Sequence, residues 1–444
     1  MKTEQIASLI AAVEAGNREE AGSILAANPA ITGADIFVAA SMADADAVDR
    51  LLAADPSLAV ASGGPHNFQP LLYLAYSRVH AMWPQREEAC ERVARALLAH
   101  GADPDTTHAG DWDGAPPLSA LYAATGVTNN PRVARILLEA GANPNDGESV
   151  YHAAEANNRE CLELLALHGA ELSARCEPWG NTPLYFLFGY RSLHPHVAIA
   201  TEGARWLLEH GADPNVTSYD IGETPLHLAV RLGRSAEDVA MLLDHGADPN
   251  ARRKDGRTPY SLAVRCGHPE LVRLLAGRGA AEEPTLIDYF VGAAARADED
   301  TVREMLLENP GLLRLLDDED RSLIVEAATM NRVATVRLLL NVGFDIAATG
   351  EAGATALHAS AWRGHRSLVE LLLDRGAPID VRCRAYNGTP LDWAVHGSTN
   401  WGQAPQSEYV AIVEAIIAAG ADPGSTNAEM GSPEVAAVLE RRIG

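Results

Sequence analysis

The chain has 444 residues, of which 47% are hydrophobic but only 5% aromatic, and its formal net charge is −25. Because a single hydrophobic core stops growing at about 250 to 300 residues, this length alone would predict two or three domains. The negative charge repels phosphate backbones and anionic lipid headgroups, which argues against nucleic acid and membrane surfaces as partners.

The N-terminus and the cysteines indicate a compartment. The first five residues lack a basic segment followed by an apolar one, and no apolar run approaches about 18 residues, so we expect a cytoplasmic protein. Five cysteines without a Cys-x-x-Cys pair argue against a disulfide framework and a zinc site. Among 35 basic residues only Lys2 and Lys254 are lysines, an arginine bias that favours a bacterial origin.

The predicted elements begin with two divergent units within residues 1–64. Residues 19–30 and 45–55 have the apolar spacing of amphipathic helices, with the stop signals Asn28-Pro29 and Asp55-Pro56. From residue 65 onward a glycine motif recurs, first as Gly-Ala-Asp-Pro-Asp at Gly101. Full or degraded copies begin at Gly141, Gly169, Gly211, Gly246, Gly279, Gly343, Gly376 and Gly420. The intervals cluster near about 33 residues, so one repeat period runs through the chain.

A second motif lies between these glycines. Residues 222–229 read Gly-Glu-Thr-Pro-Leu-His-Leu-Ala, and related segments occupy 256–260, 353–358 and 388–391. Thr can cap a helix N-terminus, Pro fits the first helical position, and Gly can end a helix in the left-handed conformation. Together the two motifs closely resemble the ankyrin repeat family over nearly the whole chain.

The resemblance implies an all-α solenoid of about twelve helix-pair repeats with β-turn fingers. We place repeat starts near residues 4, 34, 65, 106, 146, 173, 216, 251, 283, 317, 347 and 381. One solenoid over 1–444 then replaces several domains, with divergent repeats in 1–64, main repeats in 65–422 and a capping helix in 423–444. Four insertions between paired helices exceed the period, at 76–86, 125–131, 188–200 and 397–406.

In this family the fingers and first helices line a concave groove, and the insertions are expected to wall it. Exposed aromatic side chains and a set of arginines fall at these positions, so we predict that the groove binds a ligand through Trp112, Trp179, Tyr219, Arg231, Arg265, Trp362, Arg363, Tyr386, Trp393, His396 and Trp401. The arginines, at positions taken as equivalent, either pair with acidic residues of the next repeat or hold a carboxylate or phosphate.

Nine of the 15 histidines fall on repeat positions and are predicted to support the scaffold, with His152, His227 and His358 at the Thr-Pro-Leu-His position. An acid–base site would draw on Glu155, Asp113, Asp220, His194, His196 and His396. Because the pair His194 and His196 lacks an obvious third ligand, we predict no metal site. No phosphate-binding or nucleophile motif occurs, and no cofactor is expected.

Three functions remain open from these features. The resemblance favours protein–protein interaction through the groove and fingers. If the insertions enclose the groove, it would instead form a small-molecule or catalytic site lined by Trp, Tyr, His and Arg, with a small anionic or aromatic ligand. A structural spacer that binds nothing in the groove is the third hypothesis.

Overall fold

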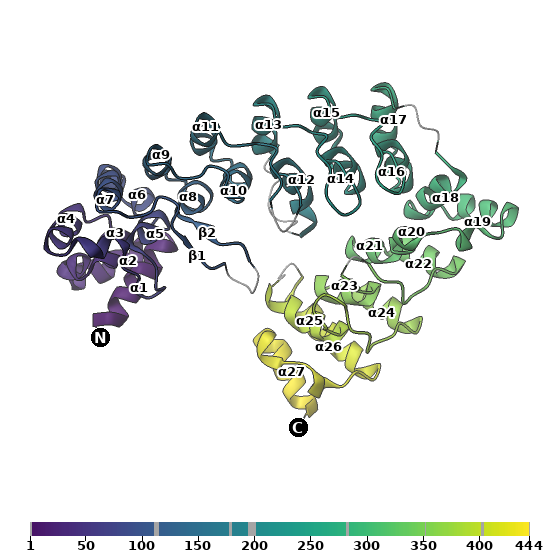
Figure 1. The fold of residues 1–444 in the computed structure, drawn as a ribbon. Coiled ribbons are helices and arrows are strands. Elements are labelled where there is room, and N and C mark those ends of the chain that lie inside the picture. The colour runs from purple at the N-terminus through teal and green to yellow at the C-terminus, as the bar shows by residue number, and fades with distance from the viewer. Residues whose placement is uncertain are drawn as a thin grey trace. The chain divides into compact units, whose positions relative to one another are not determined.

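The structure, a computed structural model, describes residues 2–443 except 111–114, 177–179, 194–200, 281–283, 351 and 401–403. Its contacts divide the chain into two compact units, residues 1–259 and 260–444, which are described separately. Helices predominate in both units, and they follow one another as antiparallel pairs (Figure 1).

The first unit contains most of the helix pairs and the hairpin. Its α-helices are α1 (Lys2–Glu14), α2 (Arg18–Ala27), α3 (Ile36–Ser41), α4 (Ala45–Ala54), α5 (Pro70–Ala75), α6 (Val79–Met82), α7 (Glu87–Ala99), α8 (Ala120–Tyr122), α9 (Pro131–Glu139), α10 (Ser149–Glu155), α11 (Arg159–Leu167), α12 (Pro183–Leu193), α13 (Thr201–Glu209), α14 (Pro225–Arg231) and α15 (Ala236–Asp244). Short 3-10 helices are η1 (Pro29–Gly33), η2 (Pro56–Val60) and η3 (Pro84–Arg86), and η4 (Ala123–Val127) is a π-helix. Strand β1 (Thr107–His108) pairs antiparallel with β2 (Leu118–Ser119) and forms one finger.

The second unit continues the alternation. Its α-helices are α16 (Pro259–Arg265), which starts at the boundary, α17 (Pro269–Gly277), α18 (Leu286–Ala295), α19 (Glu299–Glu308), α20 (Asp318–Arg321), α21 (Leu323–Thr329), α22 (Val333–Val342), α23 (Ala356–Arg363), α24 (Arg366–Asp374), α25 (Pro390–Asn400), α26 (Gln406–Ala418) and α27 (Pro433–Ile443). The 3-10 helices are η5 (Leu312–Arg314), η6 (Pro423–Ser425) and η7 (Ala428–Met430).

The helix ends form as the two motifs predict. Thr224 and Thr355 cap α14 and α23 in capping boxes completed by the imidazoles three residues later, which satisfies amide groups that a helix start leaves unpaired. All nine motif glycines that close a repeat have a positive φ, between 77° at Gly376 and 112° at Gly420. Because residues with a Cβ rarely adopt this conformation, glycine recurs at each repeat end.

Within each unit the first helices of the pairs contact one another, as α10 does α12, and the second helices do the same, as α7 does α9 (Figure 1). The core between these layers consists mainly of Ala, Leu and Val, including Ala229, Leu242 and Leu372 at 0% exposure. Small side chains let the layers approach closely, which accounts for the low aromatic content. Twelve helix pairs followed by α27 are present in the described residues, which confirms the predicted all-α ankyrin-type solenoid. One continuous solenoid over 1–444 stays a prediction.

The described parts of the four insertions are largely helical, and whether the insertions wall a groove stays a prediction. Residues 76–86 form α6 and η3, and they pack on the preceding repeat, where Ser77 Oγ donates to the Ser41 carbonyl. Residues 125–131 contribute to the π-helix, and Thr128 Oγ1 donates to the Ala75 carbonyl. The other two insertions lengthen α12 and α25. Residues 194–200 and 401–403 of these insertions lie outside the described residues, and residues 404–406 lead into α26.

Candidate functional site

The candidate site follows from counting along each first helix. The residue seven positions after the N-cap lies in the last turns of the first helix or at its C-cap. We call six of the residues at this position the floor row; they are Tyr76, Glu155 and Arg231 in residues 1–259, and Arg265, Trp362 and His396 in residues 260–444. Five of these six residues were predicted from sequence as site residues.

Tyr76 shows that the floor row contacts the fingers. Its hydroxyl lies 2.7 Å from Nε2 of His108, which is on finger strand β1. The ring of Phe68 lies 4.5 Å from the His108 ring and 6.1 Å from the Tyr76 ring, measured between centroids. This group was not predicted from the sequence, although the aromatic residue Tyr76 at the seventh position after the N-cap would have indicated it.

Glu155 belongs to a charged triplet on α10. His152 Nδ1 lies 2.8 Å from Glu155 Oε2, and His152 Nε2 lies 3.1 Å from Glu148 Oε2. Burial alone would lower the pKa of His152, but the hydrogen bonds and charges of the two glutamates raise it to about 9. The imidazolium is therefore an ion-pair partner at neutral pH, and both of its nitrogens are engaged.

The placement of His152 at the Thr-Pro-Leu-His position was wrong. The N-cap of α10 is Glu148, so Tyr151 stands three residues after the cap and His152 four. Tyr151 donates from its hydroxyl to the Asn181 carbonyl, as His227 contacts the Arg257 carbonyl and His358 the Gly388 carbonyl. A phenol here replaces the scaffold imidazole, which moves His152 onto the face of the floor row.

Arg231 is held by a buried carboxylate. Its Nε and Nη2 donate to the two carboxylate oxygens of Glu223 at 3.0 and 2.9 Å, and Glu223 is fully buried. Tyr185 donates to the same carboxylate at 2.9 Å, and Arg253, with a side chain 2% exposed, donates at 3.3 Å. Burial alone would raise the pKa of Glu223, but these guanidinium groups lower it.

Arg265 is likewise engaged, in the second unit. Its guanidinium donates to Asp288 and to Asp320, both of which also sit in the capping boxes of α18 and α20. The expected pairing with acidic residues of following repeats therefore holds for Arg265, whereas Arg231 pairs with Glu223 of its own repeat. Binding of an external carboxylate or phosphate by either arginine would have to compete with these ion pairs.

Arg363 does not occupy the position equivalent to Arg231 and Arg265. It lies eight residues after Thr355, whereas they lie seven after their Thr residues, so Trp362 takes the floor-row position. Burial lowers the pKa of the Arg363 guanidinium, which lies beside the hydroxyl of Tyr409. The predicted arginine row therefore contains two residues rather than three.

Four predicted site residues come together in the second unit. We call Trp362, Tyr386, Trp393 and His396 the aromatic cluster. The ring of Trp362 lies 5.9 Å from that of Trp393, nearly perpendicular, and stacks at 5.2 Å on His396. Tyr386, on the finger before α25, is 77% exposed and lies 6.2 Å from Trp393. The stacking arises because Trp362 and His396 hold equivalent floor-row positions in adjacent repeats.

The other predicted residues are not joined to this cluster by any described contact. Tyr219 is 45% exposed beneath the Arg175 guanidinium, 4.8 Å from its ring centroid, and the Asp220 carbonyl accepts from Lys254 Nζ. Both belong to a finger of the first unit. Several predicted site residues lie outside the described residues, namely Trp112, Asp113, Trp179, His194, His196 and Trp401.

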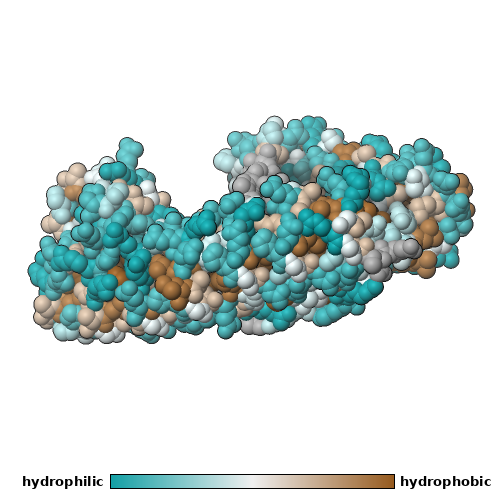
Figure 2. Space-filling model, turned by 90° about the horizontal axis from the view of Figure 1, so that it is seen from above, coloured by the Kyte–Doolittle hydropathy of each residue, from teal (hydrophilic) through white to brown (hydrophobic). Residues whose placement is uncertain are grey.

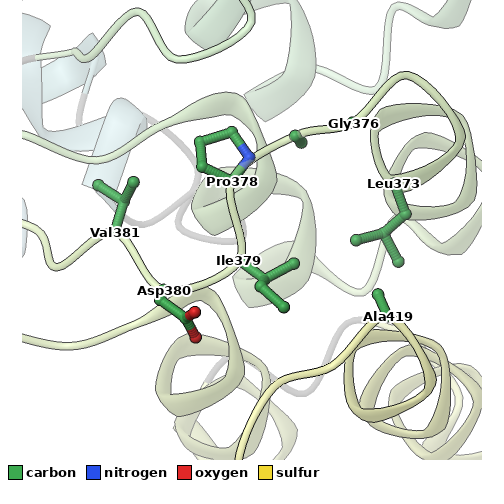
Figure 3. A pocket seen from close by; sticks show the side chains of 8 residues that line it. Leu373, Gly376, Pro378, Ile379, Asp380, Val381 and Ala419 are labelled. Carbon is green, nitrogen blue, oxygen red and sulfur yellow. The ribbon is translucent and has the colours of Figure 1, made fainter.

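A pocket of about 510 Å³ opens elsewhere in the second unit (Figure 3). It lies between the loop after α24 and the end of α26, and its lining includes Leu373, Ile379, Asp380 and Ala419. No predicted site residue contributes to it. Among the described residues, no group of three or more His, Cys, Asp or Glu side chains could hold a metal ion.

Comparisons with known proteins identify the repeat. A family model described as "Ankyrin repeats (3 copies)" matches residues 120–218, 193–285 and 290–383, more than half of the chain. The chain belongs to the ankyrin repeat family. Ankyrin repeats are protein–protein interaction modules.

Relatives of this ankyrin repeat protein match over parts of their length. Human SH3 and multiple ankyrin repeat domains protein 2 is 30% identical over 43% of this chain and 10% of its own. Mouse ankyrin repeat and SOCS box protein 16 is 32% identical over 60% of this chain and 50% of its own. The chain thus spans about half or less of these relatives. The human ASB11 ankyrin repeat domain, a solved structure, has a TM-score of 0.41 and 22% identity over 56% of this chain and 99% of its own.

The surface of the ankyrin array is mainly hydrophilic on the face that Figure 2 displays, with hydrophobic residues in small groups. Within the described part of the chain, no helix is long and apolar enough to cross a bilayer. Exposed large apolar side chains include Tyr386 and Tyr219 on fingers, and Leu307 on a second helix. The aromatic cluster is therefore distinguished by contact among its rings rather than by exposure alone.

Proposed function

We propose that this chain is a protein-interaction scaffold that binds a partner through the fingers and the floor row. The observation that carries the proposal is the aromatic cluster, in which Trp393 contacts both the floor-row side chain Trp362 and the exposed finger residue Tyr386. Trp and Tyr dominate binding energies at protein interfaces because they bury large rigid surfaces at a low entropy cost. A surface of this composition suits a protein or peptide partner.

The proposal can be tested with a photo-crosslinking amino acid placed at position 386 or 307. Tyr386 and Leu307 are both 77% exposed, but Leu307 lies on the second helix α19, so exposure is matched and the face differs. In cells of the source organism, position 386 should yield a defined protein adduct and position 307 should not. Equal labelling at the two positions, or none at 386, would contradict the proposal.

The small-molecule alternative receives no support from the described residues. Arg231 and Arg265, its anion-binding candidates, are occupied by carboxylates, and both nitrogens of His152 are hydrogen-bonded to glutamates. Burial raises the pKa of the Cys90 and Cys161 thiols to about 12, which removes them as nucleophiles at neutral pH. None of these groups therefore supplies a general acid or base for a substrate.

The proposal also includes a cytoplasmic location. All five cysteines are free thiols, and four of them are buried. Thiols that remain reduced are typical of a reducing compartment. The location is tested by fractionation of source cells with an antibody to the chain.

A further inference from the structure

The fingers of the first unit carry two exposed cations that are held beside an exposed tyrosine. Arg175 Nε and Nη2 donate to the Thr217 carbonyl at 3.0 and 2.8 Å, and the guanidinium lies over the Tyr219 ring. Lys254 Nζ donates to the carbonyls of Tyr219 and Asp220, each at 2.6 Å. These side chains join three consecutive fingers.

The contacts of the two cations leave their charge in place. The acceptors are backbone carbonyls and a hydroxyl, which carry no formal charge, and neither side chain forms an ion pair with a described carboxylate. Arg175 and Lys254 thus differ from the floor-row arginines Arg231 and Arg265, whose charges are matched by buried carboxylates. An acidic group of a partner would not have to displace an internal one at the fingers.

The charge around these finger tips is opposite to that of the whole chain. The basic residues there are Arg175, Arg231, Arg252, Arg253, Lys254 and Arg257. The described acidic residues among them are fewer, namely Asp220, Glu223 and Asp255. Further carboxylates, those of Glu171, Asp213 and Asp248, belong to the closing turns that precede the fingers. In a chain of net charge −25, the tips therefore favour an acidic partner over a basic one.

Exposed apolar side chains lie between the two cations. Tyr219 is 45% exposed and Ile221 is 40% exposed on the same finger. The Tyr219 ring packs on Gly180 of the preceding finger, where a Cβ would lie 2.0 Å from Tyr219 Cδ2. The amide of Lys254 donates to the Ile221 carbonyl at 2.9 Å, so the following finger holds this one as well. A partner would meet side chains on an ordered backbone, which lowers the entropy cost of binding.

We propose that Arg175, Tyr219, Ile221 and Lys254 form a finger surface that binds an acidic segment of a partner protein. Carboxylates of the segment approach the two cations, and an aromatic or aliphatic side chain of the same segment covers Tyr219 and Ile221. The inference rests on the proposed function, since it specifies the chemistry of a partner at the fingers of the first unit. Apolar contact supplies affinity, and charge complementarity selects the partner.

The test is a display selection of random twelve-residue peptides against the full-length protein. Nonspecific attraction to a chain of net charge −25 would recover basic peptides, so acidic ones indicate a local site. The selection is repeated on Arg175→Gln/Lys254→Gln and on Arg18→Gln/Arg159→Gln, a control that removes the same charge from exposed positions on second helices. Wild type and control should recover peptides that combine Asp or Glu with an apolar residue, and the finger variant should not.

A recovered peptide is then titrated by fluorescence anisotropy. The variant Arg175→Gln/Lys254→Gln should raise its Kd about tenfold or more, whereas Arg18→Gln/Arg159→Gln should leave it unchanged. Higher salt should weaken binding to the wild type. Equal affinity for the two double variants would overturn the proposal.

Carbodiimide coupling locates the contact, because Lys2 and Lys254 are the only lysines of the chain. Carboxylates of the bound peptide should form an amide with Lys254. Lys254→Arg keeps the charge but has no amine to couple, so it should bind the peptide without the adduct. Recovery of basic peptides or of none, or an adduct confined to Lys2 or the N-terminal amine, would overturn the assigned chemistry. Crosslinking at position 386 reports separately whether a protein binds at the aromatic cluster.

Discussion

The charge triplet on α10 predicts a specific dependence of stability on pH. Replacing His152 with Gln keeps a side chain that can hydrogen-bond but removes the imidazolium between Glu148 and Glu155. The folded pKa of His152 is about 9, above the ordinary value of 6.5, because the two carboxylates favour the charged form. The stabilisation from this charge is therefore fully present below pH 6.5 and is lost as the pH rises through 9.

The magnitude follows from the same two values. Each pH unit between 6.5 and 9 corresponds to about 1.4 kcal/mol, which gives an upper bound of about 3 kcal/mol for the ion pairs. The side chain is 30% exposed, and solvent screening reduces the expected effect to about 2 kcal/mol. We expect His152→Gln to lower the free energy of unfolding by this amount at pH 6 and by much less at pH 10.

The assay is urea unfolding of the wild type and His152→Gln, followed by circular dichroism from pH 6 to pH 10. The control is His100→Gln, because His100 Nδ1 lies 2.8 Å from the Ala96 carbonyl at the end of a second helix. The free energy of unfolding of His100→Gln should stay close to that of the wild type from pH 6 to pH 10. The argument would be refuted if the free energy of unfolding differed between the wild type and His152→Gln by the same amount at every pH. The argument would also be refuted if the NMR resonance of the His152 ring, assigned by its absence from the His152→Gln spectrum, titrated near pH 6.5.

Three further variants test the packing and the helix ends. Thr224→Ala should cost about 1 kcal/mol as a lost cap in thermal or urea unfolding. Glu223→Gln should cost about 3 kcal/mol in urea unfolding, because it leaves buried guanidinium charge without its carboxylate. Gly203→Ala should destabilise by about 1 to 3 kcal/mol, since a Cβ there would lie 1.9 Å from the Ala154 carbonyl oxygen. Gly277→Ala is its control, with open space around it, and should not destabilise in the same assay.

The fold could be predicted because its determinants are local. A threonine cap and a closing glycine each act within a few residues, so their recurrence reports the helix boundaries directly. The positive φ of Gly211 and Gly246 is a property of one residue that sequence alone implies. Insertions were harder to predict, because length in excess of a period does not say whether the extra residues lengthen a helix or form a loop. Thr128 shows the difference, since its hydroxyl reaches back to Ala75.

The candidate site was predicted in part for the same reason. Position along the helix identified Trp362 and His396, whose contact depends only on equivalent places in adjacent repeats. The sequence did not reveal that Arg231 and Arg265 are engaged in ion pairs. Their partners Glu223, Asp288 and Asp320 are brought beside them only when the helices pack. Counting residues from the cap would have corrected two assignments, that of His152 and that of Arg363.

The floor row explains how one scaffold position serves two purposes. Where it carries Arg or Glu, the side chain has a partner of opposite charge within the stack. Arg265 pairs with Asp288 of the following repeat, and Glu155 pairs with His152 on its own helix. Where it carries Trp or His, as at Trp362 and His396, the half-buried rings stack on each other, and Trp362 also contacts the ring of Trp393. Since exposed ring area is what a partner can bury, binding energy should concentrate at the repeats containing Trp362 and His396. Stability effects should concentrate at those containing Arg231 and Arg265, where loss of one charge leaves another buried.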